Sequence, residues 1–183
     1  MAAGSPLTVD ELADLISRSS GLDVDVPGVR TILRQRAAGM VHRVMLPEGV
    51  EAFRLGHHTL DDQVIENLSP RTMRAAVSTE QWERHREEVL APWRSHIHQW
   101  VESFARRGWS PVTPRYAGAP YFELLSATDD LPRITALAED SERQDFLAQL
   151  TGSHYQAFRE VRTAAQRHTR RHSPDLRLMV RLS

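Results

Sequence analysis

The sequence predicts a mostly α-helical protein in two parts, with one small β-hairpin near its N-terminus. Apolar residues recur at helical spacing along most of the 183 residues. The stretch MVHRVMLPEGVEAFRL instead reads as two strands, because Pro47-Glu48-Gly49 suits the turn between them. A Pro- and Gly-rich connector, GWSPVTPRYAGAPY, then follows a long helix and precedes several short ones, so we expect it to pack as an ordered loop.

The first part begins with two short helices. In LTVDELADLI, Thr8 is placed to cap a helix and Glu11 completes a capping box. The expected apolar face of this helix holds Leu7, Leu12, Leu15 and Ile16. Asp25 and Pro27 are placed to open a second helix that ends at Gly39, with an apolar face of Val29, Ile32 and Leu33.

Two helices joined by a Gly-containing turn read as a helix-turn-helix, and the hairpin after them is typical of a winged helix. We expect this winged-helix domain over residues 6–75, with the hairpin as its wing. The segment HTLDDQVIENL resumes helical spacing, and Ser69-Pro70 ends it.

The second part, over residues 76–183, is expected to be wholly helical. Ser78 and Gln81 form another capping box, and an apolar stripe runs from there to Gly108, with Pro92 expected to kink or split the helix. Short helices follow at about 120–128, 131–138, 141–150 and 153–170, which favours a solenoid-like array of helical hairpins. Ser173-Pro174 opens one more helix that the end of the chain leaves short, so the array is expected to be truncated at its C-terminus.

Composition excludes several classes of function. The chain has no cysteine, which removes disulfides, thiolate nucleophiles and sulfur-rich zinc sites. It also has no lysine, so it lacks a P-loop lysine or a Schiff base and should not be an NTPase by itself. A formal charge of −1 gives no global basic field of the kind that nucleic-acid binders show. No membrane span or signal peptide is evident, so a cytoplasmic location is expected.

Neither a metal site nor a catalytic site is expected. His96 and His98 fall on different faces of a helix, and the four-residue pair His168 and His172 has no third ligand. The adjacent carboxylates at 61–62, 87–88 and 129–130 should diverge rather than converge on regular elements. We therefore expect a protein that is not an enzyme.

Taken in order, several segments resemble one family. LTVDELADLI, FRLGHHTL, RSHIHQWVESFARRGWSPVTPRYAGAPYFELL, DDLPRITALAEDSERQDFLAQLTGSHYQAFREVRTA and SPDLRLMV look like consecutive parts of large actinobacterial STAND-type NTPases of the NACHT class. The resemblance runs from about Leu7 to Ser183, and its most specific parts are "GW…TP.Y" and "LPR.TALA.D". It implies a winged-helix arm and the first sensor-side helices of such a protein, without its NTPase module and its WD or helical repeats.

The resemblance also implies a nucleotide-sensing site. In that superfamily the winged helix contributes a histidine near the β-phosphate of ADP, and Phe53, Leu55, His57 and Leu60 match the motif, whereas His58 departs from it. Independently, a histidine in the first turn of a helix lies beside exposed N–H groups that stabilise an anion. His57 and Arg54 with that helix start could form a small phosphate receptor; whether His57 or His58 faces the phosphate stays open. ADP or ATP is implied only where a partner NTPase module supplies the rest of the site.

Two other functions remain open. One is a stand-alone DNA-binding regulator whose second helix meets phosphates through Arg30, Arg34 and Arg36, which the neutral net charge disfavours. The other is a protein-interaction scaffold that binds a partner through the helical array and has no link to nucleotides.

Overall fold

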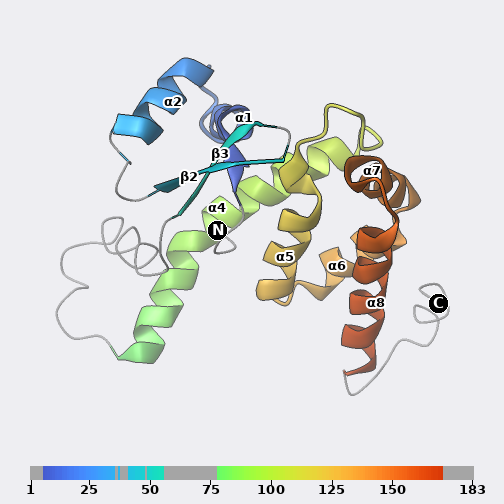
Figure 1. The fold of residues 1–183 in the computed structure, drawn as a ribbon. Helices are drawn as coiled ribbons and strands as arrows, with labels where there is room; N and C mark the ends of the chain where they lie inside the picture. The colour runs from blue at the N-terminus through green and yellow to red at the C-terminus, as the bar shows by residue number, and fades with distance from the viewer. Residues whose placement is uncertain (1–5, 36, 38–40, 48, 56–77, 171–183) are drawn as a thin grey trace. The chain divides into compact units, whose positions relative to one another are not determined.

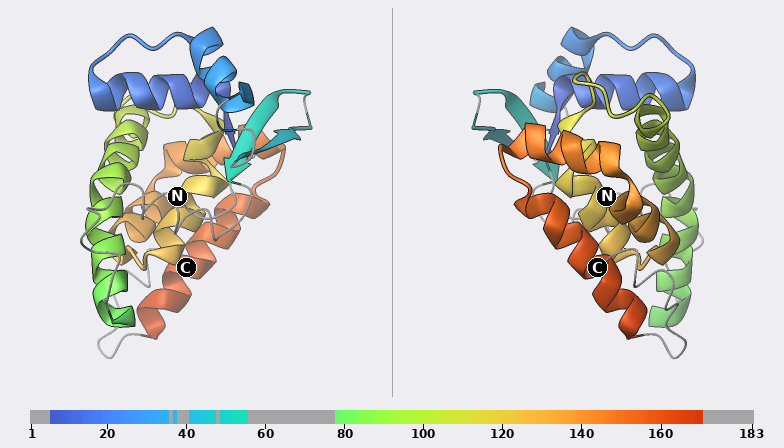
Figure 2. Two further views of the ribbon diagram at one scale, coloured as in Figure 1. Left: turned by 90° about the vertical axis from the view of Figure 1, so that its left-hand side faces the viewer. Right: turned by 90° about the vertical axis from the view of Figure 1, so that its right-hand side faces the viewer.

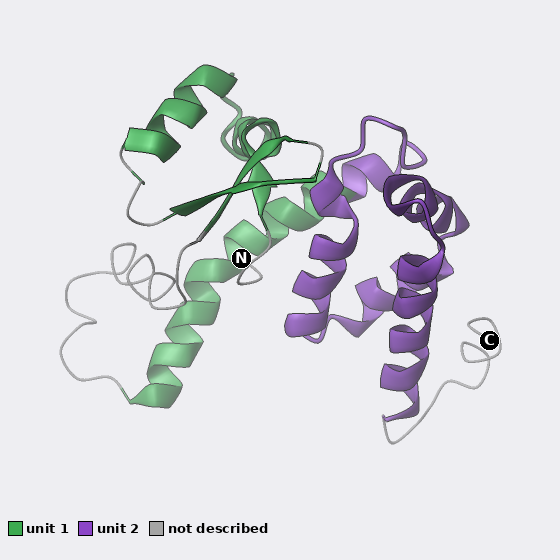
Figure 3. Ribbon diagram, viewed as in Figure 1, with its two compact units in different colours: residues 1, 3–101 green, residues 2, 102–183 purple. Residues whose placement is uncertain are grey.

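The computed structural model describes residues 6–35, 37, 41–47, 49–55 and 78–170 (Figure 1). These residues are mostly helical, with a small three-stranded antiparallel sheet, which confirms the predicted fold class at that level. The chain divides into two compact units, residues 3–101 and 102–183, and the division falls inside one long helix (Figure 3). None of the described helices combines the length and the apolar character that crossing a bilayer requires.

The described part of unit 1 contains a sheet, two short helices and most of the long one. Its elements are β1 (Leu7–Thr8), α1 (Val9–Ser20), α2 (Val26–Gln35), β2 (Val41–Met45), β3 (Glu51–Leu55) and the larger part of α4 (Thr79–Ala105). The strand order is β1-β3-β2, with β3 antiparallel to both neighbours. The predicted hairpin is therefore confirmed, and β1 is a third strand that the sequence analysis missed because two residues carry no alternation signal.

The start of α1 confirms the predicted capping box. The backbone N–H of Glu11 donates to Thr8 Oγ1 at 3.1 Å, and the N–H of Thr8 donates to Glu11 Oε2 at 2.8 Å. The helix ends at Gly21, which has φ +69° and donates its N–H to the Ser17 carbonyl. A residue without Cβ adopts this left-handed conformation at little cost, so the glycine fixes the end of α1.

The structure of unit 1 differs from the predicted helices in two details, the residues that are buried and the end of α2. The buried core residues are Val9, Ala13, Val29 and Phe53, surrounded by the partly buried Leu12, Val24, Val26, Leu33 and Val41. Ile16 and Ile32, expected in the core, are 38% and 54% exposed. Ile32 lies beyond the edge of the stripe that Val29 and Leu33 form on α2, because a stripe covers only part of a helix. The described part of α2 also ends at Gln35, before the predicted Gly39.

The long helix α4 begins with the predicted capping box. The N–H of Ser78 donates to the Gln81 side chain at 3.0 Å, and the N–H of Gln81 donates back to Ser78 Oγ at 3.3 Å. The helix runs through Pro92 without splitting, so that alternative was wrong. Within unit 1, the Trp100 indole N–H donates to Asp14 Oδ2 at 2.6 Å and joins α4 to α1.

The described part of unit 2 contains the end of α4, one short 3-10 helix and four α-helices, and the α-helices lie close to the predicted ranges. The elements after α4 are η2 (Arg115–Ala117, the 3-10 helix), α5 (Ala119–Ala127), α6 (Leu131–Glu139), α7 (Ser141–Thr151) and α8 (Tyr155–Thr169). Helix α8 packs on α6 and α7, and α5 packs on α6 and η2, an arrangement that can be followed from two sides in Figure 2. Asp130 and Asp140 cap α6 and α7 by accepting hydrogen bonds from backbone N–H groups.

Candidate functional site

The register of the sheet decides which side chains of unit 1 share a face. Successive residues of a strand point to opposite faces, and Arg43 pairs with Phe53 while Met45 pairs with Glu51. Because Phe53 belongs to the core that α1 and α2 form, Arg43, Met45 and Glu51 lie on the face that is turned toward those helices. His42 and Arg54 pair with each other and lie on the opposite face.

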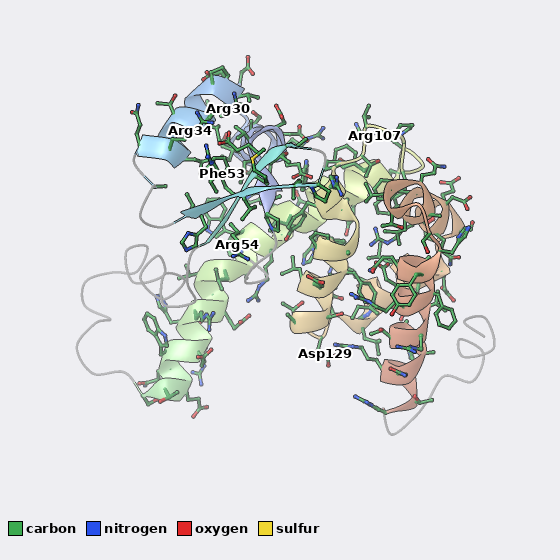
Figure 4. The ribbon with its side chains drawn as sticks, in the orientation of Figure 1. Arg30, Arg34, Phe53, Arg54, Arg107 and Asp129 are labelled. Carbon is green, nitrogen blue, oxygen red and sulfur yellow. The ribbon has the colours of Figure 1, made fainter. Side chains whose placement is uncertain are left out.

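On the first face, three arginines surround one glutamate, and we refer to Arg30, Arg34, Arg43 and Glu51 as the Glu51 cluster. Arg34 Nη2 donates to both carboxylate oxygens of Glu51, at 2.7 and 2.8 Å. Arg43 Nη1 lies 3.5 Å and Arg30 Nε 3.6 Å from the same carboxylate. Figure 4 shows Arg30 and Arg34 on α2, on the same side of the sheet as Phe53. The cluster thus draws together α2, β2 and β3.

The electrostatics of the Glu51 cluster are unbalanced. The hydrogen bonds from Arg34 hold the pKa of the Glu51 carboxyl below its ordinary value, and the charges of Arg34, Arg43 and Arg30 act in the same direction. Three positive charges and one negative charge leave a net charge of +2. The glutamate side chain is 14% exposed, whereas the arginine side chains are 46% to 63% exposed. The excess charge is therefore accessible to an anionic group from solution.

Of the residues predicted to bind a nucleotide phosphate, the structure describes Arg54. It lies exposed on β3, and no carboxylate among the described residues pairs with it. Its cross-strand neighbour on β2 is His42. His57 and His58 lie outside the described residues, and their predicted role stays a prediction.

The predicted DNA-reading helix corresponds to α2. Arg30 and Arg34 lie on the flank of α2 that adjoins Glu51, and both participate in the Glu51 cluster. Arg36 is outside the described residues. The arginines expected to meet phosphates are thus already engaged with a carboxylate, which offsets part of the positive charge of this helix.

Unit 2 has a polar centre under the connector, at Trp109. Its indole N–H donates to Asp140 Oδ2 at 2.7 Å, and its ring stacks on Phe146 with centroids 5.8 Å apart. The guanidinium of Arg143 lies 5.0 Å from the Trp109 ring centroid, within range of a cation–π contact. Trp109 also has φ +49°, a conformation that costs a large side chain energy. These contacts together hold it there.

Arg143 and Glu160 form a fully buried ion pair beside Trp109. Arg143 Nε and Nη2 donate to the two Glu160 oxygens at 3.2 and 3.3 Å, and the side chains are 0% and 2% exposed. Arg143 Nη1 and Nη2 also donate to the carbonyls of Ala117 and Gly118 in the connector. Burial raises the pKa of the Glu160 carboxyl, against the opposing influence of Arg143. The pair joins α7, α8 and the connector, which is a structural role.

The described histidines and carboxylates give no group of metal ligands. Among the described residues, no three metal-ligating side chains come together. His168 instead hydrogen-bonds Thr135 Oγ1 at 2.7 Å, and His172 is outside the described residues. Asp129 and Asp130 diverge as predicted, since Asp129 pairs with Arg167 and Asp130 with Arg133.

Sequence reasoning missed both the Glu51 cluster and the Arg143–Glu160 pair. Arg34 and Glu51 are separated by 17 residues, as are Arg143 and Glu160, and no short-range spacing rule joins such residues. Strand register was the one available signal, because it places Arg43 and Glu51 on the core face near α2.

Comparison with known proteins adds no further constraint. No protein-family model, no curated protein and no solved structure matches the chain.

Proposed function

We propose that this chain is a non-catalytic regulatory arm of a STAND/NACHT-type signalling NTPase. In this proposal unit 1 is a winged helix that senses the nucleotide bound to an NTPase module, and unit 2 relays movement from sensor repeats. The order β1-α1-α2-β2-β3 and the β1-β3-β2 sheet support the winged-helix assignment, with the β2–β3 hairpin as the wing. The NTPase module, in the same chain or another, would supply the P-loop lysine that this sequence lacks.

The observation that carries the proposal is that residues of the two most specific motifs of the resemblance are buried together. Trp109 and Tyr116 of "GW…TP.Y" are 4% and 3% exposed, and Leu131 and Ala138 of "LPR.TALA.D" are 3% and 2% exposed. Asp140, the last residue of the second motif, hydrogen-bonds Trp109 of the first. Residues that a fold requires for packing are expected to recur together in proteins that share it, so motifs joined in one buried centre favour a common fold over a chance likeness.

The sensing part of the proposal rests on the end of β3. Arg54 is exposed there, three residues before His57, where a guanidinium can approach a phosphate. A switch of this kind needs two states that differ by a few kcal/mol, with ADP and ATP favouring different states. A histidine that contacts the β-phosphate of ADP would favour the resting state by slowing the release of ADP.

The test is ADP release from the native NTPase that contains or binds this chain. His57→Ala should increase the ADP dissociation rate at least several-fold, because it removes a contact made only in the ADP-bound state. His58→Ala is the matched control, with a neighbouring imidazole removed and the backbone unchanged. An effect of His58→Ala alone would move the contact to that residue, and unchanged release in both variants would refute nucleotide sensing by this segment.

A second candidate function is DNA binding through α2, and one observation favours it. The Glu51 cluster carries an accessible net charge of +2, and two of its arginines lie on α2. A DNA-binding surface of this kind should give an affinity that falls steeply with salt, because bound phosphates release counterions. Retention of the purified chain on generic duplex DNA at low and moderate salt tests this, and a slope near zero would exclude it.

A further inference from the structure

The Glu51 cluster and Met45 form an exposed, mixed basic and apolar face on unit 1. Met45 pairs with Glu51 across the hairpin and is 61% exposed. We infer that this face is a docking surface for an acidic segment of a partner protein that presents glutamate or aspartate residues and an apolar side chain.

Charge complementarity identifies the partner as acidic. The cluster has a net charge of +2 within a chain whose formal net charge is −1, so the positive charge is a local feature. Glu51 is the carboxylate that neutralises part of it, and Arg34 engages both of its oxygens. The same guanidinium chemistry would accept further carboxylates from a partner, because arginine matches carboxylate geometry with several donors.

The distances show which arginines have capacity for a second carboxylate. Arg34 makes both short hydrogen bonds to Glu51, whereas Arg30 and Arg43 approach it only to 3.6 and 3.5 Å. Arg30 and Arg43 are held near Glu51 by its charge and are 46% and 63% exposed. Glu51 thus keeps two cations on one face, which lowers the entropy that a partner must remove when it binds them.

One feature favours a protein segment over a nucleic acid. Met45 presents an exposed apolar side chain on the same face, and methionine and arginine are both enriched in protein interfaces. DNA phosphates would gain nothing from the thioether.

This inference does not rest on nucleotide sensing. The surface lies on the face of the sheet that is turned toward α2, whereas Arg54, the described residue of the predicted phosphate site, lies on the opposite face. A partner could therefore dock here whether or not an NTPase module is present.

The test is a binding titration of the full 183-residue chain with a defined probe. The probe is a fluorescein-labelled helical peptide with glutamates one turn apart on one side and a leucine between them. Its binding is measured by fluorescence anisotropy at physiological salt. We expect Arg43→Gln to weaken binding about tenfold and Met45→Ala to weaken it severalfold, as expected for losing an interfacial charge pair and an apolar contact. Arg54→Gln, the same change on the opposite face of the sheet, should leave the affinity within about twofold.

Arg43→Gln keeps the Arg34–Glu51 hydrogen bonds, and an unchanged melting temperature would verify that the variant is folded. Three other results would overturn the inference. Equal effects of Arg43→Gln and Arg54→Gln would show binding to overall charge rather than to this face. No binding of the peptide would exclude an acidic partner at this face. Tighter binding of a duplex DNA probe, with the same dependence on Arg43, would reassign the face to nucleic acid. These results concern binding to the purified chain, whereas nucleotide sensing is tested by ADP release from the NTPase assembly. The two proposals can therefore fail separately.

Discussion

Replacing Arg143 with methionine should destabilise the protein severely, although Arg143 contacts no predicted functional residue. The substitution leaves the Glu160 carboxylate 2% exposed and without its ion-pair partner, and it removes the hydrogen-bond donors of the Ala117 and Gly118 carbonyls. Breaking one side of a buried ion pair costs about 3–5 kcal/mol. Each carbonyl left unsatisfied costs about 1–3 kcal/mol, but the variant can relax at the same site, so we do not add the terms and expect about 3–5 kcal/mol in all.

The assay is thermal unfolding followed by far-UV circular dichroism. For a chain of this length, a loss of about 3–5 kcal/mol corresponds to a fall in melting temperature of roughly 6 to 20 °C. Arg159→Met is the matched control on α8, because Arg159 pairs with Glu123 at 3.8 Å with both side chains about half exposed. A surface pair of this kind contributes about 0–1 kcal/mol, so the control should melt within about 4 °C of the native chain.

The pH dependence provides a second criterion for Arg143→Met. Burial raises the pKa of Glu160, and loss of Arg143 raises it further, so the folded variant holds this proton more tightly than the unfolded chain does. The protonated Glu160 contributes its full stabilisation below the ordinary glutamate pKa of about 4.3. This contribution is lost as the pH rises through the pKa of Glu160 in the folded variant. The defect should therefore be larger at neutral than at mildly acidic pH. A fall of less than about 2 °C at neutral pH, matching Arg159→Met, would refute the structural role of the pair.

The remaining predictions concern other contacts. Gly21→Ala should cost about 1 kcal/mol in an unfolding titration, because φ is +69° and no atom lies near the new Cβ; no loss would contradict the left-handed end of α1. Thr8→Ala removes the cap of α1 and should cost about 1 kcal/mol, and an unchanged urea midpoint would contradict the capping box. Trp109→Phe keeps an aromatic ring but leaves Asp140 without the indole donor, so we expect a loss of about 1–3 kcal/mol; full stability would show that the hydrogen bond is dispensable. Glu51→Gln should lower stability at neutral pH and have no effect at a pH below the depressed pKa of Glu51, where the native carboxyl is also uncharged; a difference that persists in acid would refute the ion-pair explanation.

The sequence predicted well those elements that local chemistry determines. The capping boxes at Thr8 and Ser78 place the starts of α1 and α4, and the turn at Pro47–Gly49 places the hairpin. Each depends on groups three or four residues apart, so a short stretch contains all the necessary information. The connector was correctly expected to be ordered, because its aromatic residues are too apolar to remain exposed.

The tertiary contacts could not be predicted in this way. Ile32 has the spacing of a core residue, yet it is exposed, because the position of the sheet decides which part of an apolar stripe is buried. The Glu51 cluster depends on the register between β2 and β3 and on the approach of α2. Of the predicted phosphate site, the structure describes Arg54 alone, which is exposed on β3, and the role of the site stays a prediction.

The most direct test of the regulatory proposal is the nucleotide content of the native protein. An antibody against this chain would capture it from cells of its source, and the captured material would be denatured and analysed for bound nucleotide by chromatography. We expect close to one ADP per copy of this chain, together with a P-loop NTPase module in the same polypeptide or in a bound partner. Material without ADP or ATP and without such a module would contradict the proposed function.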